Sequence, residues 1–346
     1  MAKLIKIFFV ALFVVAIPLS AFAGEAFKVK EIGSFYVGGR TVSLAGMPLQ
    51  EVVYSPGAPP VMLDGNGDVQ AEQMYVQFVK LANPKAKYPL VMIHGGGLTG
   101  TCWETTPDGR PGWQMAFLNA GHDVYVTDAV ERGRASWARY PEIYTSAPVF
   151  RTGQEAWPLF RFGDSDGYNT NPALRTAYAG QLFPLESFET FMKGSVPRWF
   201  TNNAVTLKAY EDMVQQIGPV VLLAHSQGAY FAIEAAMKHP DKVKGLILIE
   251  PSGGPNLAKE DISVLKNIPH LFVFGDFIEK SKAWTAIEKS RKEYHDALAK
   301  QGTDTTWISL PAIGIKGNTH AMIMDKNSDE VAAIVQDWVK QKKLMK

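Results

Sequence analysis

Ser226 lies in the pentapeptide AHSQG, residues 224–228, between an apolar run and a segment with helical spacing. A serine at a tight strand-to-helix turn, with small residues two positions before and after it, is typical of a nucleophile elbow. The turn exposes the hydroxyl, and the helix N-terminus directs free amides toward it. Ala224 replaces the usual first glycine but is still small. The sequence therefore predicts that Ser226 is a nucleophile; the alternative is a serine that only caps a helix.

His320 is the candidate general base among the seven histidines. It follows the last apolar run and precedes the C-terminal helical segment, where the chain order serine, acid, histidine places the base. His94 and His225 adjoin a glycine loop and the elbow, so we expect structural roles for them. The others lie at the edges of elements, where solvated histidines are expected: His122, His239, His270 and His295.

Two carboxylates could orient this histidine and support its positive charge. Glu250 ends the run LILIE, and Asp276 ends the run LFVFGD. Neighbouring strands lie about 4.8 Å apart, so an acid after either strand can reach the histidine. Glu250 has the longer side chain, and Pro251 restricts its backbone to extended conformations. We therefore predict Glu250 as the acid and expect Asp276 to cap a helix that begins near Phe277.

Consecutive glycines follow His94 at the end of the first continuous apolar run, in HGGG. Glycines let backbone amides approach a ligand closely. Such a loop, upstream of the elbow, is where one half of an oxyanion hole is expected. The sequence predicts that the amides near Gly96 and of Gln227 hold the oxyanion.

Together these segments resemble the α/β-hydrolase superfamily over essentially the whole mature chain. More narrowly, the chain is similar to secreted bacterial carboxylesterases whose triad runs Ser, Glu, His, with the acid directly after the sixth strand. The matching segments are HGGGLTGTCWETTPDGRPGW, VERGRAS, AHSQG, LILIEP and GNTHAMIMDKN. The resemblance implies that Ser226, Glu250 and His320 are nucleophile, acid and base. Members of that group carry a vicinal cysteine pair where this chain has Gly96-Gly97, so we expect more flexible oxyanion donors here.

The elements that position these residues follow from two patterns. Short alternating runs between Phe27 and Leu81, with turn signals at Gly38-Gly39 and Asp64-Gly65, predict antiparallel strands: an opening hairpin and a longer strand around 74–81. Six continuous apolar runs follow, which are typical of buried parallel strands. They predict the mostly parallel, doubly wound sheet of an α/β-hydrolase fold; the runs are 89–97, 122–129, 220–226, 243–251, 270–276 and 305–311.

About 90 residues separate Asp128 from Pro219, and they are rich in aromatic residues, proline and glycine. A structureless loop of this length is improbable within a compact domain. We expect a cap at about residues 131–200, inserted into a single domain of residues 24–346. Its rings either line a pocket for an apolar substrate or form the core of the cap itself.

The N-terminus has a lysine-containing start, a short apolar run and the pattern Ala21-Phe22-Ala23. These features predict a cleavable secretory signal peptide, residues 1–23, and a periplasmic or secreted protein without a stable membrane span. Cys102 is the only cysteine, so no internal disulfide is expected.

The net charge of +1 argues against nucleic acid as a partner. The sequence predicts a secreted serine hydrolase that cleaves small-molecule carboxylic esters and uses no cofactor and no metal. A lactonase or amidase with the same triad, or a non-catalytic protein that binds an apolar ligand, remains an alternative. The acyl and alcohol groups are not predicted, and a homodimer is compatible with the sequence.

Overall fold

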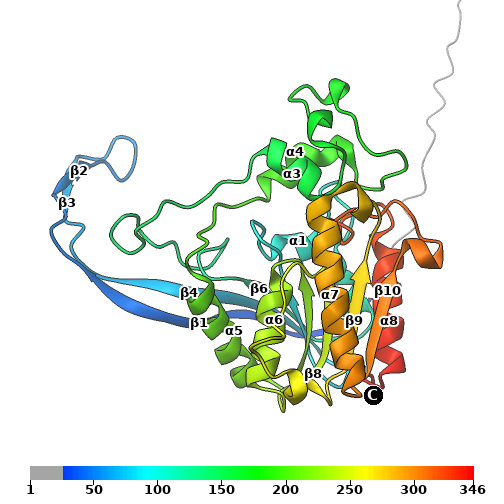
Figure 1. Cartoon of the computed structure of the whole chain (residues 1–346). Coiled ribbons are helices and arrows are strands. Elements are labelled where there is room, and N and C mark those ends of the chain that lie inside the picture. Colours follow the sequence, from blue (N-terminus) through cyan, green and yellow to red (C-terminus); the bar gives the residue numbers. More distant parts are fainter. Residues whose placement is uncertain (1–25) are drawn as a thin grey trace, which may run out of the picture.

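The computed structural model describes residues 26–346 (Figure 1). The predicted signal peptide, residues 1–23, lies outside them. Across the described range, no helix has both the length and the apolar character needed to cross a membrane.

The centre of the fold is an eight-stranded sheet with the order β1-β4-β6-β5-β7-β8-β9-β10. All six continuous apolar runs form its parallel strands, as predicted. Every residue of β7 is buried, because helices cover both faces of the sheet. The parallel strands are β5 (Leu90–Ile93), β6 (Val124–Asp128), β7 (Val220–His225), β8 (Val243–Ile249), β9 (His270–Phe274) and β10 (Thr305–Ser309).

Two hydrophobic cores lie on opposite faces of the sheet. Alternate residues of β7 enter them: Val221 and Leu223 pack in one core, Leu222 and Ala224 in the other. The first core includes α1 (Thr101–Glu104), α2 (Trp113–Asn119) and α8 (Ser328–Gln341). The second includes α5 (Asn203–Ile217), α6 (Gly228–Lys238) and α7 (Lys282–Lys300).

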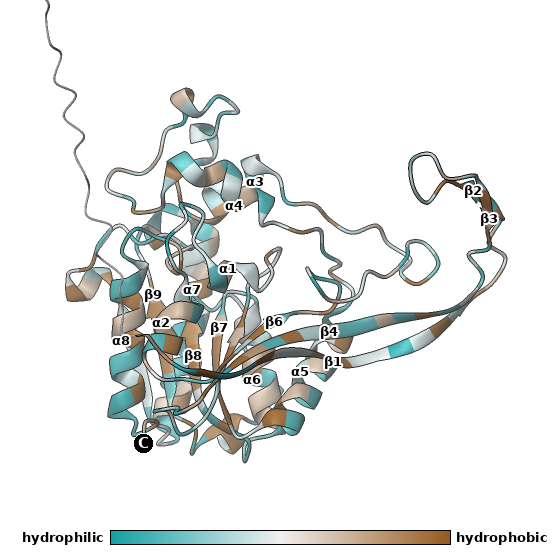
Figure 2. Cartoon of the chain, turned by 180° about the vertical axis from the view of Figure 1, so that it is seen from behind, coloured by the Kyte–Doolittle hydropathy of each residue, from teal (hydrophilic) through white to brown (hydrophobic). Residues whose placement is uncertain are grey.

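The N-terminal strands form a long antiparallel hairpin that projects from the body (Figure 1). Its strands are β1 (Val29–Leu44) and β4 (Gly67–Leu81), and its far end carries β2 (Gln50–Val52) paired with β3 (Val61–Leu63). Tyr54 and Met62, near this end, are exposed, and the ribbon of β2 and β3 is coloured as hydrophobic in Figure 2.

The prediction of a turn at Gly38-Gly39 was wrong. Both glycines have positive φ, at 69° and 87°, but they lie within β1 and its pairing with β4 continues beyond them. Glu72 on β4 also has positive φ, at 67°. The glycines therefore mark a local distortion of a paired ribbon, which requires the same backbone freedom as a chain reversal.

Residues 131–200 lie above the ends of the strands that carry the candidate site and contain only short helices (Figure 1). Several of their rings form a common core: Trp157, Phe162, Phe183, Phe188 and Phe191 are all buried. Phe160 belongs to the same buried core and also lines a pocket, together with the exposed Phe200. The helices are α3 (Gly153–Leu159), α4 (Phe188–Lys193) and 3-10 turns at Ser165–Gly167, Pro172–Leu174 and Leu185–Ser187; further 3-10 turns outside this segment are Ile262–Leu265, Ile278–Lys280 and Pro311–Ile313.

Candidate active site

The turn between β7 and α6 holds Ser226 in a strained conformation. Its φ is +53°, in the left-handed region that is costly for a residue with a side chain. Gly228 allows the close approach behind it, because a Cβ there would lie 2.6 Å from the carbonyl oxygen of His94. The geometry matches the strand-turn-helix context expected of a nucleophile elbow.

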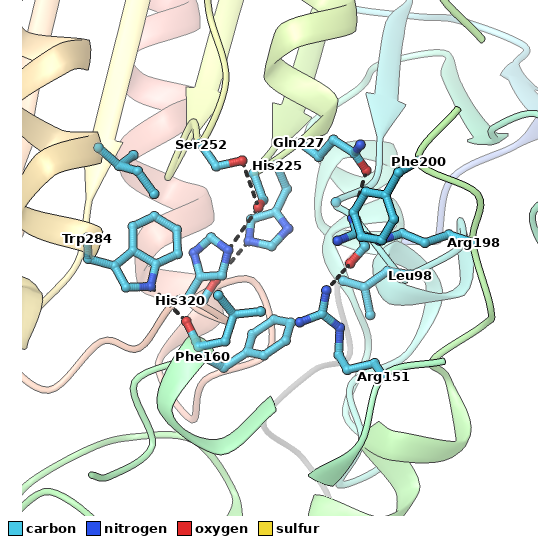
Figure 3. Close-up of a pocket in the computed structure, with 15 residues that line it drawn as sticks. Leu98, Arg151, Phe160, Arg198, Phe200, His225, Gln227, Ser252, Trp284 and His320 are labelled. Carbon is cyan, nitrogen blue, oxygen red and sulfur yellow. Dashed lines mark hydrogen bonds between the residues drawn. The ribbon is translucent and has the colours of Figure 1, made fainter. Parts of the chain in front are cut away.

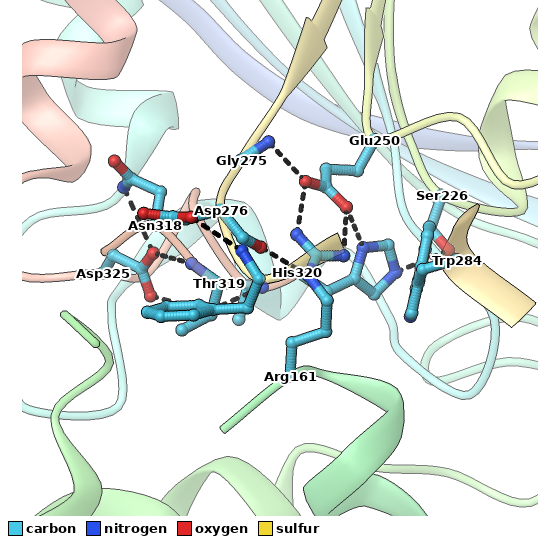
Figure 4. A network of polar contacts seen from close by, with 12 residues as sticks. Arg161, Ser226, Glu250, Gly275, Asp276, Trp284, Asn318, Thr319, His320 and Asp325 are labelled. Atoms are coloured by element: carbon cyan, nitrogen blue, oxygen red, sulfur yellow. Dashed lines mark hydrogen bonds and ion pairs between the residues drawn. The ribbon is translucent and has the colours of Figure 1, made fainter. Parts of the chain in front are cut away.

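Ser226, His320 and Glu250 lie together, in a line of two hydrogen bonds (Figure 4). His320 Nδ1 lies 3.0 Å from Glu250 Oε2, and His320 Nε2 lies 2.9 Å from Ser226 Oγ. Because a carboxylate only accepts hydrogen bonds, Nδ1 carries the proton and Nε2 is left to accept the serine proton. Ser252 Oγ is a more distant partner of the serine hydroxyl, at 3.4 Å.

Glu250 is fully buried and accepts four hydrogen bonds. Besides His320, its donors are the backbone amide of Gly275, at 2.6 Å, and both terminal nitrogens of Arg161, at 2.6 and 2.7 Å. Burial alone would raise the pKa of this carboxyl, but the charge of Arg161 and the bonds to Arg161 and His320 outweigh it and lower the pKa to about 2. Glu250 is therefore a carboxylate at neutral pH.

Asp276 makes no hydrogen bond to the histidine side chain. The prediction that it caps a helix was wrong, because the 3-10 turn that begins at Ile278 has no side-chain cap. Its Oδ1 accepts from the amide of Phe277 at 2.8 Å, and its Oδ2 accepts from the amide of Gly317 at 2.9 Å. Its own carbonyl accepts from Arg161 Nε at 2.8 Å. The residue thus fastens the loop that carries His320 and the guanidinium that contacts Glu250.

His320 is only 3% exposed, and the ring of Trp284 lies 4.1 Å away between centroids. Burial lowers the pKa of His320 to about 4; Arg161 and Arg151 act in the same direction, and Glu250 opposes them. The imidazole is consequently neutral at neutral pH, which is the state that a general base requires.

The backbone around His320 is held from two sides. Its amide donates to the carbonyl of Phe160 at 3.0 Å, and its carbonyl accepts from His225 Nε2 at 2.8 Å. Farther along the loop, buried Asp325 accepts from the amide and the hydroxyl of Thr319. Burial raises the pKa of Asp325 to about 6.

The glycine loop packs directly on the elbow. A Cβ on Gly95 would lie 3.0 Å from Ser226 Cβ, and one on Gly96 would lie 2.9 Å from Gln227 Oε1. Within residues 26–346, no protein acceptor is recorded for the amides of Gly96 and Gln227. Both predicted oxyanion donors therefore lie beside the serine, and their N–H groups are free to bind a ligand.

Of the six other histidines, His239 and His295 are half-buried, and the prediction that His295 lies at the edge of an element was wrong, because it lies within α7. His94 and His225 have the structural contacts expected of them: His94 Nε2 accepts from the amide of Ala129, and His225 binds the backbone of the base. The prediction that His122 and His270 are solvated was wrong, because both are buried, against Gln336 and the carbonyl of Ile268 respectively. Their positions at strand starts did not reveal the covering helices.

A pocket of about 270 Å³ leads to Ser226 (Figure 3). Its lining includes the apolar side chains of Leu159, Phe160, Trp284 and Ile287 and two arginines, Arg151 and Arg198. The described residues contain no cluster of three or more His, Cys, Asp or Glu placed to hold a metal ion. Cys102 is buried, which raises the pKa of its thiol.

Sequence reasoning missed the arginines of the site. Arg161 lies in the aromatic run PLFRF, and a charged residue there is rarely buried unless it is paired. That signal pointed to a buried partner, but not to which one. For Arg151 and Arg198 the sequence offered no comparable signal.

A family model described as the alpha/beta hydrolase family matches residues 90–338. The chain is 29% identical, over 337 aligned residues, to a probable secreted lipase from a fungus (Fungal sp., strain ATCC 74256); the match covers 78% of this chain and 86% of the relative. A solved structure described as a novel bacterial esterase is 32% identical, with a TM-score of 0.77 and coverage of 92% of this chain and 97% of that one. The chain belongs to the alpha/beta hydrolase family, and its fold is the one predicted.

Proposed function

We propose that this protein is a secreted serine hydrolase that cleaves carboxylic esters, with Ser226 as nucleophile, His320 as general base and Glu250 as the acid. The observation that carries the proposal is the line of hydrogen bonds from Glu250 through His320 to Ser226. The similarity to a probable secreted lipase and to a bacterial esterase supports an ester substrate. The lipase likeness and the N-terminal pattern at residues 1–23 support export.

The proposed reaction begins when Ser226 Oγ attacks the ester carbonyl carbon while His320 Nε2 takes its proton. The amides of Gly96 and Gln227 hold the oxyanion that forms. The carbonyl then reforms, and the alcohol leaves with the proton from His320. Water then attacks the acyl-serine and gives a proton to His320; when the acid leaves, His320 passes that proton to Ser226 Oγ and free Ser226 is restored.

Glu250 keeps the proton of the neutral imidazole on Nδ1 and faces the positive charge that His320 acquires. Glu250 also forms an ion pair with Arg161, through two hydrogen bonds. The carboxylate is thus held rigidly, so that it orients the ring without rearrangement during turnover.

Hydrolysis of lactones or amides would use the same groups and differ in the shape of the pocket. A non-catalytic binding protein is less favoured, because binding alone does not require a strained serine aligned with a neutral, buried histidine.

The test is hydrolysis of 4-nitrophenyl acetate by the purified mature protein and by the variant Ser226→Ala. We expect turnover by the parent protein and a loss of at least about a thousandfold in the variant, since removing the nucleophile leaves only residual catalysis. The exposed Ser263 supplies a matched control, and Ser263→Ala should keep full activity. Equal activity of Ser226→Ala and the parent would refute the proposal.

A further inference from the structure

Arg151 and Arg198 line the same pocket as Ser226 (Figure 3). Arg198 Nη1 donates to the side-chain Oε1 of Gln227 at 3.2 Å, and Arg151 Nη2 donates to the carbonyl of Gly96 at 3.4 Å. Gly96 and Gln227 are the two residues whose amides are proposed to hold the oxyanion. The guanidinium groups therefore lie beside the place where the ester carbonyl would bind.

Protein carboxylates balance the charge of these two arginines only in part. Arg151 Nη1 lies 3.3 Å from Glu155 Oε1, but the Glu155 side chain is 50% exposed, whereas that of Arg151 is 6% exposed. In the described part of the chain, no carboxylate lies within ion-pair distance of Arg198, and no residue lining the pocket is acidic. Burial, and then the charges of nearby Arg198 and Arg151, lowers the pKa of Arg132 to about 9, so Arg132 stays positive at neutral pH and adds a third positive charge.

This arrangement costs free energy unless an anion completes it. Burial, followed by the charge of Arg151, lowers the pKa of Arg198 to about 10, so Arg198 stays positive at neutral pH. A partly buried charge without a counter-charge is unfavourable, and the ring of Phe200, 4.2 Å from the Arg198 guanidinium, carries no net charge. The two contacts to Gly96 and Gln227 use one N–H each of the five that a guanidinium carries, and a neutral amide could make them. The contacts that hold Gly96 and Gln227 in place therefore do not explain why Arg151 and Arg198 are charged residues.

We propose that Arg151 and Arg198 bind an ionised carboxylate of the substrate, so that the preferred esters carry a carboxylate a few bonds from the scissile carbonyl. This inference rests on the proposed function of Ser226. A guanidinium presents a planar fork of donors that matches both oxygens of a carboxylate. The pocket lining also includes the apolar side chains of Trp284 and Ile287. The substrate class is thus an ester with one anionic end and an otherwise apolar body.

The first test compares kcat/KM for two pairs of esters at low salt. Mono-4-nitrophenyl adipate against 4-nitrophenyl hexanoate places the charge on the acyl side, and 4-acetoxybenzoate against 4-acetoxybenzamide places it on the alcohol side. We expect the charged member of at least one pair to be favoured by about 10- to 100-fold, the range of a charge-assisted hydrogen-bonded pair. Arg198→Gln should reduce that ratio by about tenfold or more.

The matched control is Arg139→Gln, which changes an exposed arginine of the same inserted segment and should leave the ratio unchanged. The second test measures adipate binding to the Ser226→Ala variant by calorimetry, without turnover. We expect saturable binding that is lost when Arg198→Gln is added.

A ratio near one in both ester pairs, or a preference that survives Arg198→Gln, overturns the proposal. If none of the four esters is hydrolysed, the proposed function fails instead. The anion site is then decided by calorimetry alone: binding of adipate that depends on Arg198 supports it, and no binding at millimolar adipate overturns it.

Discussion

Two arginine environments near the candidate site, Arg161 beside Glu250 and Arg198 beside Gln227, differ in how their charge is balanced. On the acid side, Arg161 is fully buried and makes two hydrogen bonds to Glu250. On the side of Gly96 and Gln227, Arg198 donates to the amide oxygen of Gln227 and lies over the ring of Phe200, at 4.2 Å, but no carboxylate pairs with it in the described chain. A buried, paired arginine is part of the framework, whereas a pocket arginine without a carboxylate is available to a ligand.

The comparison also explains the electrostatics of His320. Arg161 neutralises much of the charge that Glu250 would otherwise present to the imidazole, and Arg151 adds a further positive charge. Burial is the largest cause that lowers the pKa of His320, and the charges of Arg161 and Arg151 are smaller causes in the same direction. An anionic substrate bound at Arg151 would offset part of this effect during turnover.

The largest effect is expected from Glu250→Gln, which removes the carboxylate on the acid side. We expect turnover to fall by about 10⁴-fold, as in other triads that lose their acid. Asp276→Asn should cost mainly stability, because Asp276 fastens backbone amides rather than the imidazole. Turnover and thermal unfolding of both variants separate these outcomes. Loss of turnover in a folded Asp276→Asn, with Glu250→Gln intact, would assign the acid to the later strand.

Arg161→Gln removes the buried ion pair between Arg161 and Glu250. Removing one member of a buried ion pair leaves an uncompensated charge, so we expect the free energy of unfolding to drop by about 3–5 kcal/mol. Arg139→Gln, at an exposed pair with Glu142, should change it by less than about 1 kcal/mol. Urea unfolding of both variants measures the difference. Equal, small effects would mean that the Arg161 pair is not part of the framework.

The pH dependence of kcat/KM reports the base. The rate should rise as His320 loses its proton, with a midpoint near pH 4, and stay level from about pH 6 to mildly alkaline pH. Arg161 lowers the pKa of His320, so Arg161→Gln should move the midpoint to higher pH. A rate that falls steadily from pH 5 to 8 would contradict a histidine base.

The smallest effect is expected from Arg198→Gln on stability. Because its charge has no carboxylate partner and lies near Arg151, we expect a change within about 1 kcal/mol, or a slight gain. Urea unfolding beside Arg161→Gln is the direct comparison. A loss as large as that of Arg161→Gln would show that both arginines belong to the framework.

Much of the fold could be predicted because its signals are local. The six apolar runs fix the parallel sheet, and AHSQG places a serine between a strand and a helix. Gly38-Gly39 misled because positive φ serves a distorted strand as well as a turn. One ground for choosing Glu250 over Asp276 was wrong: Glu250 has φ +48°, in the left-handed region, and not the extended backbone expected before Pro251. Their contacts now distinguish the two acids.

The arginines were beyond sequence reasoning for a physical reason. Arg161 and Glu250 are 89 residues apart, and no periodicity relates a residue of the segment 131–200 to a strand end. Arg151 and Arg198 reach the pocket from separate loops that meet through an isolated bridge between Val149 and Arg198. Charge in such an insertion is normally solvated, so only the fold shows that these side chains face the nucleophile.

Covalent labelling of the purified mature protein with a fluorophosphonate, followed by peptide mapping by mass spectrometry, tests the central claim most directly. Ser226 should carry the adduct, and His320→Ala should suppress it, because the serine is activated only by a neutral histidine within hydrogen-bond distance. No adduct under conditions that label a control esterase, or an adduct on another residue, would contradict the account.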